Sequence, residues 1–115
     1  MTAYFLDTGF LVALEAADDQ HHAAAIAAWR EIRKGRVTFV TTSYVFDEVA
    51  TFFNSRGYHA KAITIAEAWR DFSHHSDKRY SLTDCVSFAV MKRRRIKKAL
   101  AFDRHFTQAG FERLP

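Results

Sequence analysis

Four carboxylic acids stand where a hydrophobic run ends or where a helix is expected to begin. Two of them directly follow hydrophobic runs, at residues 4–6 and 100–102. Carboxylate oxygens are the ligands that Mg²⁺ prefers, and a metal-held water can attack a phosphodiester bond. Folding that gathers these acids would therefore make a site for a hard divalent cation and for hydrolysis. The four candidates are Asp7, Glu48, Asp84 and Asp103.

The hydrophobic pattern predicts strands that alternate with helices. We expect strands at residues 3–6, 36–41 and 99–102. The helices are expected over about residues 10–14, 18–34, 43–56, 59–72 and 82–91. Such an alternation is typical of an α/β fold, in which helices cover both faces of a parallel sheet and give three α/β/α layers.

This fold would bring the acids to one edge of the sheet. In open α/β sheets, ligands bind beyond the carboxyl ends of the strands, where Asp7 and Asp103 would lie. Glu48 and Asp84 would reach the same edge from neighbouring helices. Several buried, unpaired carboxylates repel one another, and bound Mg²⁺ or Mn²⁺ would relieve that repulsion.

Each acid alone also has a purely structural explanation. Asp7 could cap the helix that follows it, and Asp103 could hold a turn. Asp84 could form a capping box with Ser81, and Glu48 could face solvent. A common location favours the metal site, because capping requires no shared position.

Composition predicts a small cytoplasmic protein. The chain has 115 residues and a single cysteine, Cys85, so neither disulfides nor a cysteine zinc cluster is available. One domain over residues 1–115 is expected at this length. The start of the chain has no basic leader, and no hydrophobic run is long enough to cross a bilayer, so we expect no membrane association.

Positive charge is concentrated in the second half of the chain. Residues 1–50 carry net charge −3 and residues 51–115 carry +7, with the densest basic run at residues 92–98. Such a run can supply the phosphate attraction of an RNA-binding surface, although a solvated helix end explains it equally well. The candidate RNA-binding residues are Lys92, Arg93, Arg94, Arg95 and Arg104.

Four segments resemble the motifs of PIN-domain ribonucleases, especially the VapC-type toxins of bacterial toxin–antitoxin pairs. The segments read FLDTGFLVAL, TSYVFDEV, YSLTDCVSFA and LAFDRHF, beginning at residues 5, 42, 80 and 100. The resemblance covers nearly the whole chain and implies a PIN-like fold with about four strands. It also implies a metal-dependent endoribonuclease that binds Mg²⁺ or Mn²⁺. The implied catalytic and metal-binding residues are the same four acids, Asp7, Glu48, Asp84 and Asp103.

The resemblance assigns supporting roles and partners as well. Thr8 and Thr83 match hydroxyl residues that lie beside the acids and can hold a carboxylate in place. RNA is the implied substrate. The implied protein partner is a cognate antitoxin that covers the acidic site, because a carboxylate cluster is a natural receptor for arginine.

The chain departs from the family pattern in two places. Gly9 replaces a small polar residue, so one hydroxyl near the acids is absent. A stretch of about twenty residues before Ser81 is missing, which is enough to remove one strand. The second strand would then lie at the sheet edge, partly shielded by the helix over residues 59–72. We therefore expect a homodimer or an exchanged-segment dimer, helped by three aromatic residues predicted to be exposed, Phe52, Phe53 and Trp69.

Two alternatives remain open. A PIN-like module weakened by the missing stretch could bind RNA or an antitoxin without efficient cleavage. Residues 6–9, Leu-Asp-Thr-Gly, also resemble the catalytic loop of aspartic proteases. Phe10 and the long alanine-rich helices argue against that all-β family.

Overall fold

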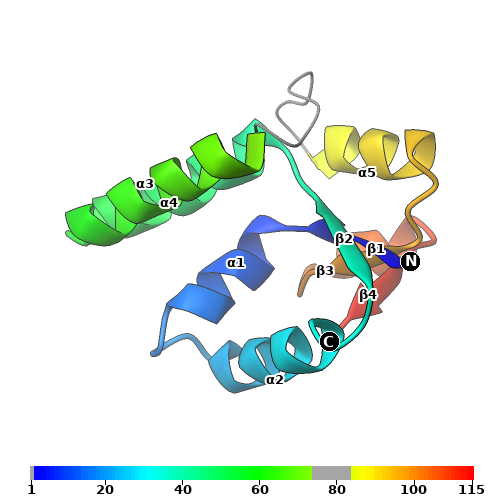
Figure 1. The fold of residues 1–115 in the computed structure, drawn as a ribbon, viewed down its shortest axis with the longest axis horizontal. Helices are drawn as coiled ribbons and strands as arrows, with labels where there is room; N and C mark the ends of the chain where they lie inside the picture. Colours follow the sequence, from blue (N-terminus) through cyan, green and yellow to red (C-terminus); the bar gives the residue numbers. More distant parts are fainter. Residues whose placement is uncertain (1, 74–83) are drawn as a thin grey trace.

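Four parallel strands form the central sheet of the computed structural model, which describes residues 2–73 and 84–115 (Figure 1). The order across the sheet is β2-β1-β3-β4. Phe5 of β1 lies opposite Val40 of β2, and Leu6 lies opposite Leu100 of β3. The strands span Thr2–Leu6 (β1), Val37–Val40 (β2), Lys98–Leu100 (β3) and Glu112–Leu114 (β4).

Helices cover both faces of this sheet. Tyr4 and Leu6 of β1 face one helical layer, where Phe10 and Ala25 are buried. Phe5 points to the opposite layer and packs in one cluster with buried residues of four other helices. The helices span Thr8–Glu15 (α1), His22–Ile32 (α2), Ser43–Ser55 (α3), His59–Ser73 (α4), Asp84–Arg93 (α5) and Arg104–Gln108 (α6). The predicted three-layer α/β/α fold with about four strands is confirmed.

Two helices, α3 and α4, form a hairpin at one side of the molecule (Figure 1). The Thr42 hydroxyl caps α3 by accepting a hydrogen bond from the Val45 amide at 3.2 Å. At the other end Gly57 has φ +81°, and the Tyr58 amide donates to the Phe53 carbonyl at 2.9 Å. This geometry closes α3 and turns the chain back along it.

None of the three α3–α4 aromatics predicted to be exposed is fully exposed. Phe53 is buried, so the prediction that it is exposed is wrong. Its ring packs edge-on against Phe52 in the core between the helices and the sheet. Phe52 and Trp69 are half-buried, and Trp69 packs against Phe46 with ring centroids 5.3 Å apart.

Strand β2 lies at an edge of the described sheet, as predicted. Residues 59–73 are helical, and the rest of the interval before Ser81 lies outside the described residues. Helix α4 packs along α3 rather than along β2, so the predicted shielding of this edge by α4 is not found in the described part of the chain. None of the described helices is long and apolar enough to cross a membrane.

Candidate active site

Asp7 lies at the junction between β1 and α1. It is 9% exposed and occupies the N-cap position of α1 with an extended backbone (φ −99°, ψ 159°). Its amide donates to the Leu100 carbonyl at 3.1 Å, which ties it to the carboxyl end of β3. The Asp7 carboxylate makes no capping hydrogen bond to α1. Helix capping therefore does not explain why an acid is buried at this position.

Glu48 reaches the start of α1 from the middle of α3. The Thr8 hydroxyl donates to Glu48 Oε1 at 3.0 Å, across forty positions of sequence. Glu48 is exposed, so this bond limits the rotamers of a side chain that would otherwise move freely in solvent. The structure thus brings together a predicted acid, Glu48, and its predicted supporting hydroxyl on Thr8, the residue that follows Asp7.

Asp103 follows β3 and caps the short helix α6. Its Oδ1 accepts a hydrogen bond from the His105 amide at 2.8 Å, and His105 Nδ1 lies 3.2 Å from the same oxygen. The structural role considered for this acid is therefore real. Both contacts involve Oδ1, and neither involves Oδ2.

The fourth acid, Asp84, is the first residue of α5, and its side chain lies outside the described part of the structure. Thr83 also lies outside it. Within the described residues, no three histidine, cysteine, aspartate or glutamate side chains form a group that could hold a metal ion. The four candidate ligands are nevertheless all carboxylates, and oxygen ligands suit Mg²⁺ or Mn²⁺ better than softer metals.

Two threonines that sequence reasoning missed organise the same edge. Thr41 is 1% exposed, and its hydroxyl donates to the Leu6 carbonyl at 2.7 Å. This bond joins the end of β2 to the end of β1, immediately before Asp7. Thr42 then caps α3 and sets the direction in which Glu48 is presented. Hydroxyl residues between a strand and a helix are the local signal that could have indicated these roles.

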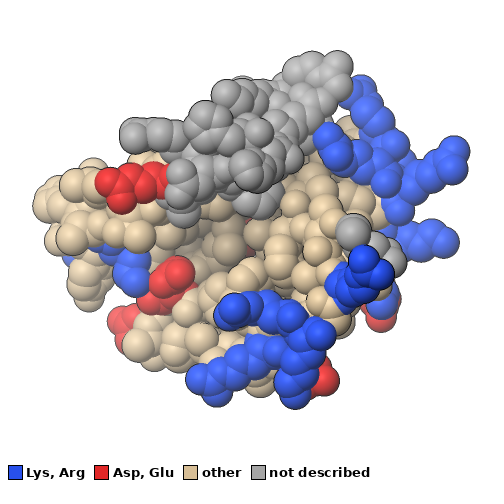
Figure 2. Space-filling view, viewed as in Figure 1, with Lys and Arg blue, Asp and Glu red and all other residues tan. Residues whose placement is uncertain are grey.

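The predicted RNA-binding residues fall into two separate places. Arg104 directly follows Asp103 at the acidic edge and is exposed. Lys92 and Arg93 lie in the last turn of α5, and the two arginines after them lead into β3. Because β3 begins only at Lys98, this basic group lies at the amino ends of the strands. Figure 2 shows lysines and arginines gathered on that side of the molecule, where α5 ends in Figure 1.

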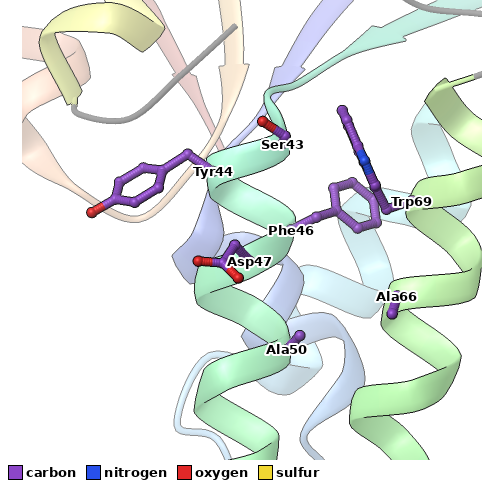
Figure 3. Close-up of a pocket in the computed structure, with 7 residues that line it drawn as sticks. All are labelled: Ser43, Tyr44, Phe46, Asp47, Ala50, Ala66 and Trp69. Atoms are coloured by element: carbon purple, nitrogen blue, oxygen red, sulfur yellow. The ribbon is translucent and has the colours of Figure 1, made fainter. Parts of the chain in front are cut away.

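A groove between α3 and α4 lies beside the acidic edge (Figure 3). It has a volume of about 420 Å³. Phe46 of α3 and Trp69 of α4 point toward each other and pack together, and Tyr44 points away from Trp69 on the other side of α3. Asp47 adds a second exposed acid next to Glu48. The groove lining is Ser43, Tyr44, Phe46, Asp47, Ala50, Ala66 and Trp69.

A parallel sheet between two helical layers, with acids after β1 and β3, is the arrangement of PIN-domain ribonucleases. Comparison with known proteins shows that the chain belongs to the VapC-type toxins of this class, and it is therefore a toxin-type endoribonuclease. No family model matches the chain. It is 33% identical over 126 residues to the 23S rRNA-specific endonuclease VapC20 of two Mycobacterium tuberculosis strains, CDC 1551 / Oshkosh and H37Rv. These alignments cover 93% of this chain and 94% of the relative.

The crystal structure of Mycobacterium tuberculosis VapC20, described as a sarcin-ricin loop cleaving toxin, matches the fold with a TM-score of 0.72. That match has 31% identity and covers 94% of this chain and 95% of the other. The sequence alignment also bears on the expected missing stretch. It spans 126 positions, whereas 93% of 115 residues is about 107, so about 19 positions of the alignment have no residue of this chain.

Proposed function

We propose that this protein is a Mg²⁺- or Mn²⁺-dependent endoribonuclease that cuts 23S rRNA in the sarcin–ricin loop. The observation that carries the proposal is Asp7, a buried carboxylate at a helix N-cap that does not cap its helix. Carboxylate oxygens are the ligands that Mg²⁺ and Mn²⁺ prefer, so an acid that does not cap its helix is suited to bind such a cation. Its position at the carboxyl ends of β1 and β3 is the expected ligand-binding edge of such a sheet.

The acids would divide the work between metal binding and orientation of the attacking water. Asp7, Asp84 and Asp103 are the proposed metal ligands. Glu48, fixed by the Thr8 hydroxyl, either completes this set or accepts a hydrogen bond from the attacking water. A bound divalent cation would supply a water of lowered pKa and would stabilise charge on the phosphate. Arg104, exposed beside Asp103, is placed to contact the RNA backbone.

The substrate assignment rests on the relative that shares most of its length with this chain. VapC20 is named for 23S rRNA, and it is 33% identical to this chain with 93% coverage. Single-stranded loops are the usual targets of specific RNA recognition, because their bases are open to contact. A sarcin–ricin loop fits this requirement.

The test is cleavage of purified 23S rRNA followed by mapping of the new RNA ends. We expect one dominant cut in the sarcin–ricin loop, no cut in EDTA, and recovery when Mg²⁺ or Mn²⁺ is added in excess. A cut that persists in EDTA would contradict the metal requirement. Dominant cuts elsewhere in 23S rRNA would contradict the substrate assignment.

A second candidate function is a binding module with little cleavage. One observation favours it: the Asp103 carboxylate accepts a hydrogen bond that caps α6, which is a structural role for one of the four acids. Such a module would retain RNA affinity at every metal concentration and would never shorten the RNA.

An antitoxin is the proposed protein partner. Glu48 and Asp47 are exposed next to the α3–α4 groove, so the acidic edge can receive a basic side chain from another protein. We expect the neighbouring gene to encode a small DNA-binding protein that forms a complex with this chain. Addition of that protein should stop rRNA cleavage, and undiminished cleavage in the complex would contradict its role as an inhibitor.

A further inference from the structure

A pocket at the turn between α5 and β3 lies away from the acidic edge. It has a volume of about 570 Å³, within the range of small-molecule sites. Met91 and Ile96 are buried beneath it, and Phe111 is half-buried beside them. The floor of the pocket is therefore apolar, and a flat ring could pack on it.

Three exposed cationic side chains surround this apolar floor. Lys92, Arg95 and Lys97 line the pocket and form no ion pair with any other described residue. The one acid in the lining is Glu112, and its Oε2 lies 3.9 Å from Lys98 Nζ. Positive charge at the pocket is thus in excess, as in the blue group at the α5 end of the molecule in Figure 2.

Arg95 holds a backbone conformation that favours glycine. Its φ is +57°, the only positive φ of a non-glycine residue in the described chain. The Ile96 amide donates to the Met91 carbonyl at 2.8 Å, which is the helix-closing pattern that usually contains glycine at this position. An arginine that is kept in a strained position beside a cationic pocket points to a role for its side chain.

We propose that this pocket binds one nucleotide of the RNA substrate outside the cleavage site. The phosphate would lie among Lys92, Arg95 and Lys97, and the base would lie on the exposed part of Phe111, above the buried Met91 and Ile96. This inference rests on the proposed RNA cleavage. An acidic protein could also pair with the three cations. It has no nucleobase, however, that would stack on the apolar floor of the pocket.

The position of the pocket predicts which RNAs can use it. Helix α5 rises about 14 Å from Asp84 to Arg93, at about 1.5 Å per residue. A stacked nucleic-acid strand advances about 3.4 Å or less per phosphate along its helix, so in a stacked strand the bound nucleotide is about four or more nucleotides from the cut. A stem–loop can reach both places, and a short oligonucleotide such as a dinucleotide at the cut cannot.

Binding measurements test the pocket independently of cleavage. In the Asp7→Asn background, we expect Lys92→Ala with Lys97→Ala to weaken binding of a sarcin–ricin stem–loop about tenfold and to lower the salt slope of log K by about two. In the chain with Asp7 intact, the same pair should lower the ratio of stem–loop to short-oligonucleotide cleavage. The matched control, Arg33→Ala with Lys34→Ala at the end of α2, removes equal charge elsewhere and should change neither quantity.

Three results would overturn the inference. They are equal losses in the control pair, an unchanged salt slope, and a loss confined to antitoxin binding. Absence of cleavage by the wild-type protein would instead count against the proposed function, since the binding measurement does not depend on it.

Arg95→Gly provides a second test in which stability and binding change in opposite directions. Glycine relieves the backbone strain, so the melting temperature should rise by about 4 °C. Loss of the guanidinium should at the same time weaken stem–loop binding several-fold. A more stable variant with unchanged RNA affinity would contradict a role for Arg95 in the pocket.

Discussion

Thr8 is the residue that connects two of the acids. It follows Asp7 directly and donates its hydroxyl to Glu48, so one side chain links the β1–α1 junction to α3. The bond is exposed and contributes little to stability, since water replaces it readily. Its value lies in holding the Glu48 carboxylate in one orientation.

Replacement of Thr8 by valine removes this hydroxyl while keeping the side-chain shape. We expect Thr8→Val to lower rRNA cleavage about tenfold, within the usual range for residues that support a metal ligand. The free energy of unfolding, measured by thermal melting, should stay within about 0.5 kcal/mol of the wild-type value, as is usual for surface positions. Thr8→Ser keeps the hydroxyl and should retain most activity. Equal losses in the serine and valine variants would show that the hydroxyl is not the cause.

A substitution at Gly9 can add a hydroxyl near the acids, whereas Thr8→Val removes one. A β-carbon at this position meets no atom within 4 Å, and the residue has no positive φ. Serine should therefore fit in the first turn of α1 and should raise the free energy of unfolding by about 0.5 kcal/mol, because glycine is a poor helix former. Gly110→Ser, at φ +95°, should instead destabilise the fold. If Gly9→Ser removed cleavage without loss of stability, close approach of RNA to the bare backbone would explain the glycine.

At the scale of elements, the α3–α4 hairpin fixes where Glu48 and the adjoining groove lie. Gly57 closes α3 with φ +81°, and the following amide bonds back to Phe53. Val49 and Phe53 then anchor the hairpin in the core. The acidic edge thus depends on a turn far from the acids.

Alanine at Gly57 should destabilise the fold by about 1 kcal/mol, because a side chain in the left-handed region is strained. Gly35→Ala is the matched control. Gly35 has no positive φ, and its added carbon would meet only the Ile32 carbonyl oxygen at 3.8 Å, an ordinary contact. Urea unfolding of both variants measures the difference, and equal stabilities would contradict the assigned role of Gly57.

The edge position of β2 leads to a prediction about assembly. Strand edges tend to be covered or to pair with another chain. Val37 and Phe39 of β2 are only half-buried, and α4 packs on α3 rather than on this strand. We therefore keep the prediction of a homodimer, to be measured as the solution mass by light scattering. A monomeric mass over a wide range of concentration would contradict it.

At the scale of the whole molecule, the sequence predicted the elements that have strong hydrophobic periodicity. Strands β1, β2 and β3 and most helices lie within a few residues of their expected places. The hydrophobic pattern does not predict strand β4, because its residues Glu112 and Arg113 carry charge. It pairs instead with β3, and the Glu112 amide donates to the carbonyl of Lys97, the residue before β3, at 2.8 Å.

The functional residues also divide into those that the sequence pattern predicts and those that only the three-dimensional structure reveals. Asp7 and Asp103 could be placed from sequence because each directly follows a hydrophobic run, and in the structure each lies just past the carboxyl end of a strand. The Thr8–Glu48 bond could not, since no local pattern connects residues forty positions apart. The basic run was recognised, but its position at the amino ends of the strands required the topology, in which α5 precedes β3.

The central claim is that Asp7 is buried for catalysis and not for folding, and Asp7→Asn tests it most directly. Asparagine is an equally good N-cap residue and has the same shape, so helix α1 should form normally. We expect cleavage of 23S rRNA to fall at least about a hundredfold, the scale of losing a catalytic electrostatic contact, with thermal melting and RNA binding retained. Cleavage at the wild-type rate in this variant would contradict the account.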